Sequence, residues 1–136
     1  MTWHTGRLID HVHLRARNFL ATRYFYEKVL AALGVRIEHA GEGWFQADEL
    51  FVDTADARTV PTHIHLAFQA KSRAMVDAFH KAALAAGGKD NGKPGERDYH
   101  PGYYGAFVLD PDGNNIEAVY HGPVRRSADS VRLDPA

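Results

Sequence analysis

Apolar and polar side chains alternate along two short segments of the chain, residues 8–16 and 62–69. An alternation with a period of two is typical of a strand that has one face against a core. The two segments match each other at a constant offset of 52 residues, because His11-Val12-His13-Leu14 corresponds to His63-Ile64-His65-Leu66. The pattern therefore indicates an internal repeat.

Apolar residues at helical spacing follow each of these strands. They are Phe25, Val29, Leu30 and Leu33 in the first copy, and Met75, Val76, Phe79 and Ala83 in the second. Gly34 and Gly88 come at the ends of the two helical patterns, so each glycine is predicted to end its helix in a left-handed conformation.

Further strands are predicted after each helix. They cover about 35–40, 43–47 and 49–53 in the first copy, and 104–110 and 115–121 in the second, where Asp110-Pro-Asp-Gly-Asn114 gives a strong turn signal. The glycine-rich, polar residues 88–103 are predicted to be mostly loop. The order β-α-β-β-β, given twice, predicts an α+β fold with module one at about 8–55 and module two at about 60–121. Residues 1–121 thus form one domain, and 122–136 a tail or surface strap.

Composition narrows the functions that this fold can serve. Lys and Arg number 16 against 17 Asp and Glu, so no net field favours nucleic acid or an anionic membrane. No apolar run has the length of a membrane span or a secretory signal, so we expect a cytoplasmic protein. Cysteine is absent, which leaves nitrogen and oxygen ligands for any metal site.

Histidine is the unusual residue, with 9 copies, several of them inside the strand patterns. Alternation places the paired histidines of both repeats on the strand faces that point away from the helices, together with Arg15 and Glu117. A single strand histidine is more often structural than a ligand. Paired histidines in a duplicated unit, with a carboxylate on the equivalent face, instead favour a divalent metal bound by His11, His63 and Glu117. His13 and His65 remain alternative ligands or supporting groups.

Three segments, IDHVHLRA from Ile9, THIHLAF from Thr62 and YYGAFVLDPDGNNIEAVYH from Tyr103, occur in an order and at a spacing that resemble the vicinal oxygen chelate superfamily. That superfamily contains glyoxalase I, extradiol dioxygenases, and fosfomycin- and bleomycin-resistance proteins. The resemblance implies two βαβββ modules that form a U-shaped mixed sheet around a metal-binding cavity, often completed by a homodimer. It places the metal ligands on His11, His63 and Glu117.

Glyoxalase-type members have a fourth ligand, a carboxylate on the last strand of module one. Leu50-Phe51-Val52 matches Ile116-Glu117-Ala118 here, so Phe51 takes that place, and Glu49 or Asp53 serves only in another register. A three-ligand site is more similar to the dioxygenase and fosfomycin-resistance branches.

The leading hypothesis is an enzyme with one divalent ion per chain, Fe, Mn, Ni or Zn, that chelates vicinal oxygens of a small substrate. Its reaction is that of a lyase or isomerase, or of a dioxygenase, with Glu117, His13 and His65 as catalytic groups. Residues predicted to line the substrate cavity are Arg15, Tyr99, His100 and Tyr103. The alternatives are a metal-free drug- or metabolite-binding protein of the bleomycin-resistance type, and a catalytically silent regulatory or scaffold domain.

Overall fold

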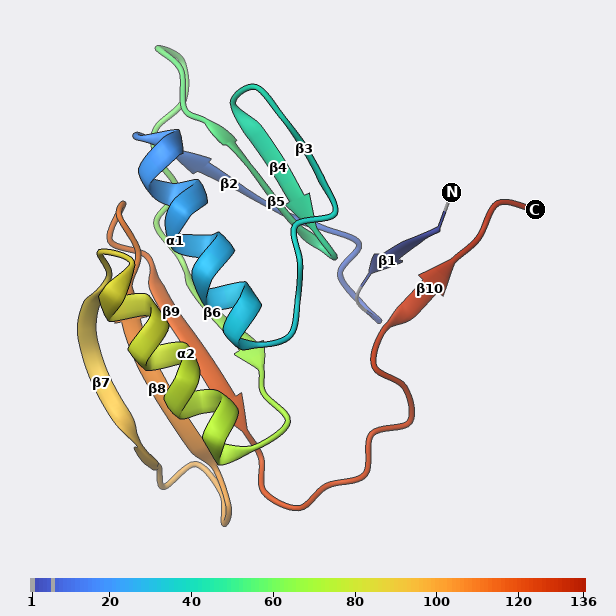
Figure 1. The fold of residues 1–136 in the computed structure, drawn as a ribbon, viewed down its shortest axis with the longest axis vertical. Coiled ribbons are helices and arrows are strands. Elements are labelled where there is room, and N and C mark those ends of the chain that lie inside the picture. The colour runs from blue at the N-terminus through green and yellow to red at the C-terminus, as the bar shows by residue number, and fades with distance from the viewer. Residues whose placement is uncertain (1, 6) are drawn as a thin grey trace.

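The computed structural model describes residues 2–5 and 7–136. Its elements follow one another as two similar modules, flanked by a short strand near each end of the chain. Figure 1 shows the two modules, with both helices on the same side of the sheets. The predicted pair of βαβββ modules is confirmed.

Module one consists of β2 (Val12–Ala16), α1 (Phe19–Ala32), β3 (His39–Gly41), β4 (Trp44–Ala47) and β5 (Leu50–Thr54). Its sheet has the order β2-β5-β4-β3, in which β2 runs parallel to β5 and the other pairs are antiparallel. The parallel pair forms because the chain returns to β5 by way of α1, which lies across one face of the sheet.

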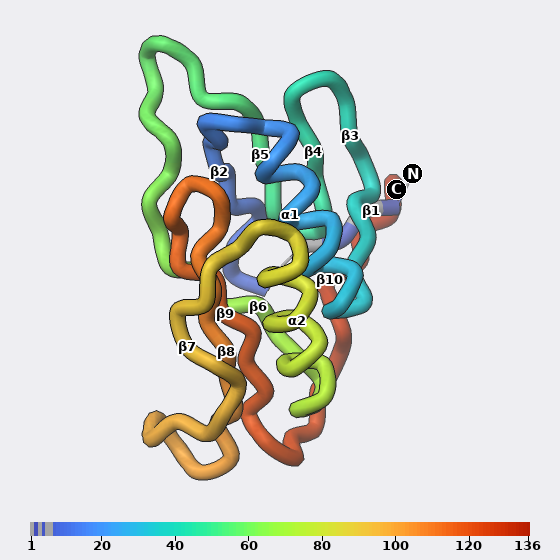
Figure 2. The backbone as a smooth tube through the Cα atoms, turned by 60° about the vertical axis from the view of Figure 1, so that its left-hand side comes forward, coloured from blue at the N-terminus to red at the C-terminus, as the bar shows by residue number. Residues whose placement is uncertain are grey.

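Module two repeats this order with β6 (His65–Gln69), α2 (Arg73–Ala85), β7 (Lys89–Glu96), β8 (Tyr104–Leu109) and β9 (Asn115–Tyr120). Its sheet has the order β6-β9-β8-β7, again with a parallel first pair. Within the described residues, no strand of one sheet pairs with a strand of the other. Figure 2 shows the two sheets as separate halves of the molecule.

Side-chain caps begin both helices, since Asn18 Oδ1 accepts the N–H of Ala21 and Ser72 Oγ accepts the N–H of Met75. Gly34 follows α1 with a φ of 78°, as predicted. The prediction for Gly88 is wrong, because Gly87 takes the left-handed conformation after α2, with a φ of 94°. Gly88 is instead needed for close packing, since an added Cβ would lie 2.7 Å from the ring of Phe25.

The predicted loop at 88–103 is wrong for its first half, which forms the strand β7 against β8. The pairing shifts register between Asp90 and Gly92 and again between Gly92 and Gly95. These bulges, together with the glycines and a proline, hide the alternation that normally reveals a strand.

The core lies between the helices and the sheets. Strand residues of one parity are buried there, for example Leu14, Val52 and Ile116, beside Phe25 and Phe79 of the helices. Residues of the opposite parity in module one, such as His13, are partly exposed. Each sheet therefore presents one face without a helix, and we call it the open face.

The predicted tail contains one further strand. β10 (Val131–Leu133) pairs antiparallel with β1 (Trp3–Thr5), and His4 Nδ1 lies 2.7 Å from Ser130 Oγ. Figure 1 shows this two-stranded ribbon to one side of both sheets, reached by a long connection from β9. The two ends of the described chain thus lie together.

Candidate functional site

Glu117 is the central polar group of the open face of module two. It lies in the middle of β9, beside Ala67 of the parallel strand β6, and only 2% of its surface is exposed. His65 Nε2 is 3.0 Å from its Oε1, and the Tyr103 hydroxyl donates to its Oε2. A buried carboxylate is costly unless it is paired or hydrogen-bonded, and both of its oxygens have a partner here.

A tight turn fixes the strand that carries Glu117. Asp110 Oδ1 accepts the N–H groups of Asp112 and Asn114, and Gly113 turns the chain with a φ of 86°. Asn114 Oδ1 then accepts the N–H of Ile64, 2.8 Å away, just before β6 begins. The predicted turn therefore sets the register that brings His65 to Glu117.

Tyr103 is held with its hydroxyl on Glu117 by a cluster of rings. The ring centroids of Tyr99, His100 and His121 lie 4.8, 5.4 and 5.4 Å from that of Tyr103, all edge to face. Burial raises the pKa of the Tyr103 phenol, and the hydrogen bond to Glu117 and its charge raise the pKa further. The phenol thus stays protonated, as a hydrogen-bond donor.

Module one carries an equivalent pair of side chains on its own open face. His13 Nε2 is 2.7 Å from Asp53 Oδ1, and Arg15 Nη1 is 3.7 Å from the same oxygen. The strand registers place Asp53 beside Arg15, just as Glu117 lies beside Ala67. The predicted match of Phe51 to Glu117 is therefore wrong by two residues, and Asp53 is the carboxylate of module one at that position.

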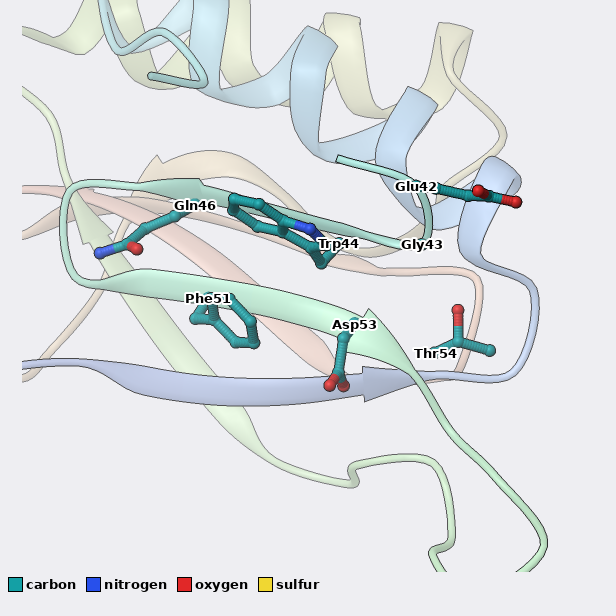
Figure 3. A pocket seen from close by; sticks show the side chains of 7 residues that line it. All are labelled: Glu42, Gly43, Trp44, Gln46, Phe51, Asp53 and Thr54. Carbon is teal, nitrogen blue, oxygen red and sulfur yellow. The ribbon is translucent and has the colours of Figure 1, made fainter. Parts of the chain in front are cut away.

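Phe51 has a different role, as part of an aromatic surface next to Asp53. Its ring stacks with Trp44 at a centroid distance of 5.9 Å and meets the edge of His13 at 4.9 Å. Trp44 and Phe51 border a hollow of about 620 Å³ whose lining also includes Gln46 and Glu42. Figure 3 shows the Asp53 carboxylate and the Phe51 ring on the side of the sheet away from the helices.

The three predicted metal ligands are not together in one chain. Glu117 contacts His65, whereas His63 is exposed and precedes β6. The His11 side chain is 59% exposed just before β2, with its Nδ1 2.7 Å from Asp10 Oδ1. Among residues 2–5 and 7–136, no three His, Asp or Glu side chains form a group that could hold a metal ion.

The predicted substrate residues fall into two groups. Tyr99, His100 and Tyr103 lie together beside Glu117, whereas Arg15 lies on module one. His121 belongs to the first group, because its Nδ1 is 2.8 Å from His100 Nε2, and sequence analysis gave it no role. The signal was present, since His121 continues the alternation that starts at Glu117.

Each open face therefore carries imidazole and carboxylate groups, the donor types that suit a divalent ion. Such donors fit a metal in kind. In number they fall short within the part of the chain that the structure describes, where no three of them come together.

Comparison with known proteins agrees with the fold. Residues 8–118 match the family model of the Glyoxalase/Bleomycin resistance protein/Dioxygenase superfamily. The chain is similar to a glyoxalase/bleomycin resistance protein from Albidiferax ferrireducens, with 31% identity over 81% of this chain and 95% of that one, and a TM-score of 0.70. A search of curated proteins gives no match.

Two further structures share the fold at lower identity. One is a glyoxalase-related enzyme from Fulvimarina pelagi, with 17% identity, coverage of 96% and 99%, and a TM-score of 0.68. The other is a glyoxalase/bleomycin resistance protein/dioxygenase family enzyme from Burkholderia phytofirmans, with 22% identity, coverage of 82% and 96%, and a TM-score of 0.65.

Neither helix in the described part of this chain has the length and apolar character needed to cross a membrane.

Proposed function

Because the chain belongs to the Glyoxalase/Bleomycin resistance protein/Dioxygenase superfamily, we propose that it is a divalent-metal-dependent enzyme acting on a small substrate with vicinal oxygens. The observation that carries this proposal is the buried carboxylate of Glu117 on an open sheet face, held by His65 and Tyr103. Burying a carboxylate is costly, and a cation bound on this face would offset that cost.

The metal ligands in this proposal are His11, His63 and Glu117, with Asp53 in the place of a fourth. His63 and Glu117 belong to module two, whereas His11 and Asp53 belong to module one. Since the two sheets of one chain are separate, the proposal includes a homodimer in which module two of one copy faces module one of the other. Each dimer then holds two equivalent sites, related by two-fold symmetry.

A bound divalent ion would supply Lewis-acid stabilisation of negative charge that develops on substrate oxygens. The residues of this chain supply the rest. Tyr103 donates to one oxygen of Glu117 and so orients the carboxylate. We assign the acceptance and return of a proton to His65 and His13, each of which contacts a carboxylate, and the binding of an anionic substrate group to Arg15, which lies near Asp53. Both a lyase or isomerase and a dioxygenase reaction are compatible with these roles.

The hollow in module one supports a second candidate function, a metal-free protein that binds a drug or metabolite. Its volume of about 620 Å³ and the stacked rings of Trp44 and Phe51 suit a planar organic molecule. Such a protein needs no carboxylate at the position of Glu117, so the first function is preferred.

Metal analysis separates the two functions. Untagged protein, loaded in turn with Mn, Fe, Ni and Zn and then desalted, is expected to retain about one ion per chain by plasma mass spectrometry. Glu117→Gln and His63→Ala should each lose most of that metal, because each removes a ligand. Glu27→Gln and His39→Ala, which change exposed residues, are the matched controls. Wild-type protein that retains none of the four metals would overturn the proposal of a metal-dependent enzyme and favour a metal-free binding protein.

A further inference from the structure

A second, smaller pocket lies at the far end of the strands that carry Glu117. It has a volume of about 200 Å³, and its lining includes Gln69, Lys71, Val119, His121 and Arg126. We call it the tail pocket, because Arg126 belongs to the segment between β9 and β10. This volume leaves room for a small charged group and some of its hydration.

The tail pocket contains cationic groups with a carboxylate between them. Asp129 Oδ1 is 3.1 Å from Lys71 Nζ and 3.9 Å from Arg126 Nε. Asp129 is itself highly exposed, with 75% of its side chain accessible. An anion from the chain's own tail thus occupies the edge of a basic pocket, in a contact that solvent weakens.

Arg126 is only partly satisfied by this contact. Its Nη1 donates to Gln69 Oε1 at 2.6 Å, which fixes the guanidinium against β6. Its Nε is buried and has no hydrogen-bond partner, since the distance to Asp129 is too long for a hydrogen bond. A buried, unpaired donor is costly, and the charge of the Arg126 guanidinium, which lines the pocket, is only weakly offset by Asp129.

The position of the pocket relates it to Glu117. Gln69 and Val119 are register partners, two residues further along the same strands as the pair Ala67 and Glu117. Two strand residues span about 7 Å, at roughly 3.3 Å each. His121 provides a second link, since it lines the pocket and its ring contacts Tyr103, the donor to Glu117.

We propose that the tail pocket binds the anionic oxygens of a small molecule, as a phosphate or carboxylate group, and that Asp129 competes for the same place. Lys71 and Arg126, whose Nε is unpaired, supply the positive charge. Its role in catalysis rests on the proposed function: the pocket would hold the acidic end of a substrate whose reacting oxygens lie toward Glu117.

Anion binding is tested without metal. Protein stripped over a chelating resin, so that no soluble chelator competes, is titrated with inorganic phosphate, and separately with acetate, by calorimetry at low ionic strength. Arg126→Gln is expected to weaken binding about tenfold or more, because it removes a charge-assisted hydrogen bond. Asp129→Asn should tighten binding about threefold, the competition expected from one exposed ion pair.

Matched controls separate the pocket from the general charge of the surface. Arg125→Gln is the control for Arg126→Gln, because it removes the same positive charge from an exposed neighbour. Asp134→Asn is the control for Asp129→Asn, because it removes a negative charge from a residue paired with Arg132. Stronger binding of phosphate than acetate assigns a phosphate group, and the reverse order assigns a carboxylate. The proposal is overturned if neither anion binds, or if Arg126→Gln behaves like Arg125→Gln. Because no metal is present in these titrations, the anion affinities that they measure do not depend on whether Glu117 binds a metal ion.

Discussion

Tyr103 determines the geometry of the Glu117 carboxylate through its hydroxyl group. Its ring is packed by Tyr99, His100 and His121, so its hydroxyl has little freedom to leave Glu117 Oε2. The other oxygen of Glu117 meets His65, whose side chain is 51% exposed and is much freer to move. One oxygen is therefore fixed, and the other is covered by a side chain that can move away and admit a new partner.

Tyr103→Phe tests the role of this hydroxyl in orienting Glu117. The variant keeps the ring packing but removes the donor, so we expect metal affinity to fall by about tenfold, as for loss of an outer-shell partner of a ligand. Competition with a fluorescent chelator measures the affinity. Tyr99→Phe, whose side chain touches the same ring and is exposed, is the control and should match the wild type. Equal affinities for the two variants would contradict the role of Tyr103.

Sequence reasoning located Glu117 correctly on the open face, because alternation along a strand is local information. It matched Phe51 to Glu117 and so found no carboxylate at that position in module one, because the register between β2 and β5, which puts Asp53 there, is set by pairing between distant segments. The contacts of His65 and Tyr103 with Glu117 join residues 52 and 14 positions apart, and only the folded sheet brings them together.

At the scale of elements, α1 is tied to the β8–β9 turn across the two modules. The Tyr26 hydroxyl, fully buried, donates to Asp110 Oδ2 at 2.6 Å. The same carboxylate accepts the side-chain amide of Asn114 and two backbone N–H groups of the turn. Burial, and the charge of Asp110, raise the pKa of Tyr26, so its proton stays on the phenol.

Tyr26→Phe should therefore destabilise the protein by about 1.5–3 kcal/mol, the usual range for a hydrogen bond to a charged group. Urea unfolding followed by circular dichroism gives the free energy of unfolding. Tyr24→Phe removes a hydroxyl from the exposed face of the same helix and should stay within about 0.5 kcal/mol of the wild type. A Tyr26→Phe variant as stable as this control would show that the inter-module bond contributes nothing.

The predicted elements agree with the structure where the apolar residues recur at one regular spacing, as in α1 and α2. They fail at β7, because its register shifts and glycines remove the alternation. They also miss β1 and β10, whose three-residue strands are too short for a pattern and pair across the whole chain. Short or irregular strands are defined by their partners, which a local pattern does not contain.

At the scale of the whole molecule, the proposed sites lie between two copies, and this can be tested by mixing two defective chains. His11→Ala removes one proposed ligand of module one, and Glu117→Gln removes one proposed ligand of module two. Each variant alone is expected to bind little metal. A mixed dimer regains one intact site, because one chain supplies His11 and the other supplies His63 and Glu117.

Mixed dimers, purified by two different affinity tags that are then removed, should hold about half of the wild-type metal by mass spectrometry. A site within one chain would be broken in both copies of the mixed dimer, and no metal would return. Full metal binding by His11→Ala alone would instead show that His11 is not a ligand.

The pairing of β1 with β10 places Thr2 Oγ1 2.5 Å from Asp134 Oδ1, so Thr2 and Asp134 lie side by side. A short peptide linker could therefore close the chain into a ring with little distortion. New ends could then be opened in the connection between β5 and β6, giving a circular permutant that begins with module two. In that molecule the terminal ribbon would become the covalent bridge between the modules.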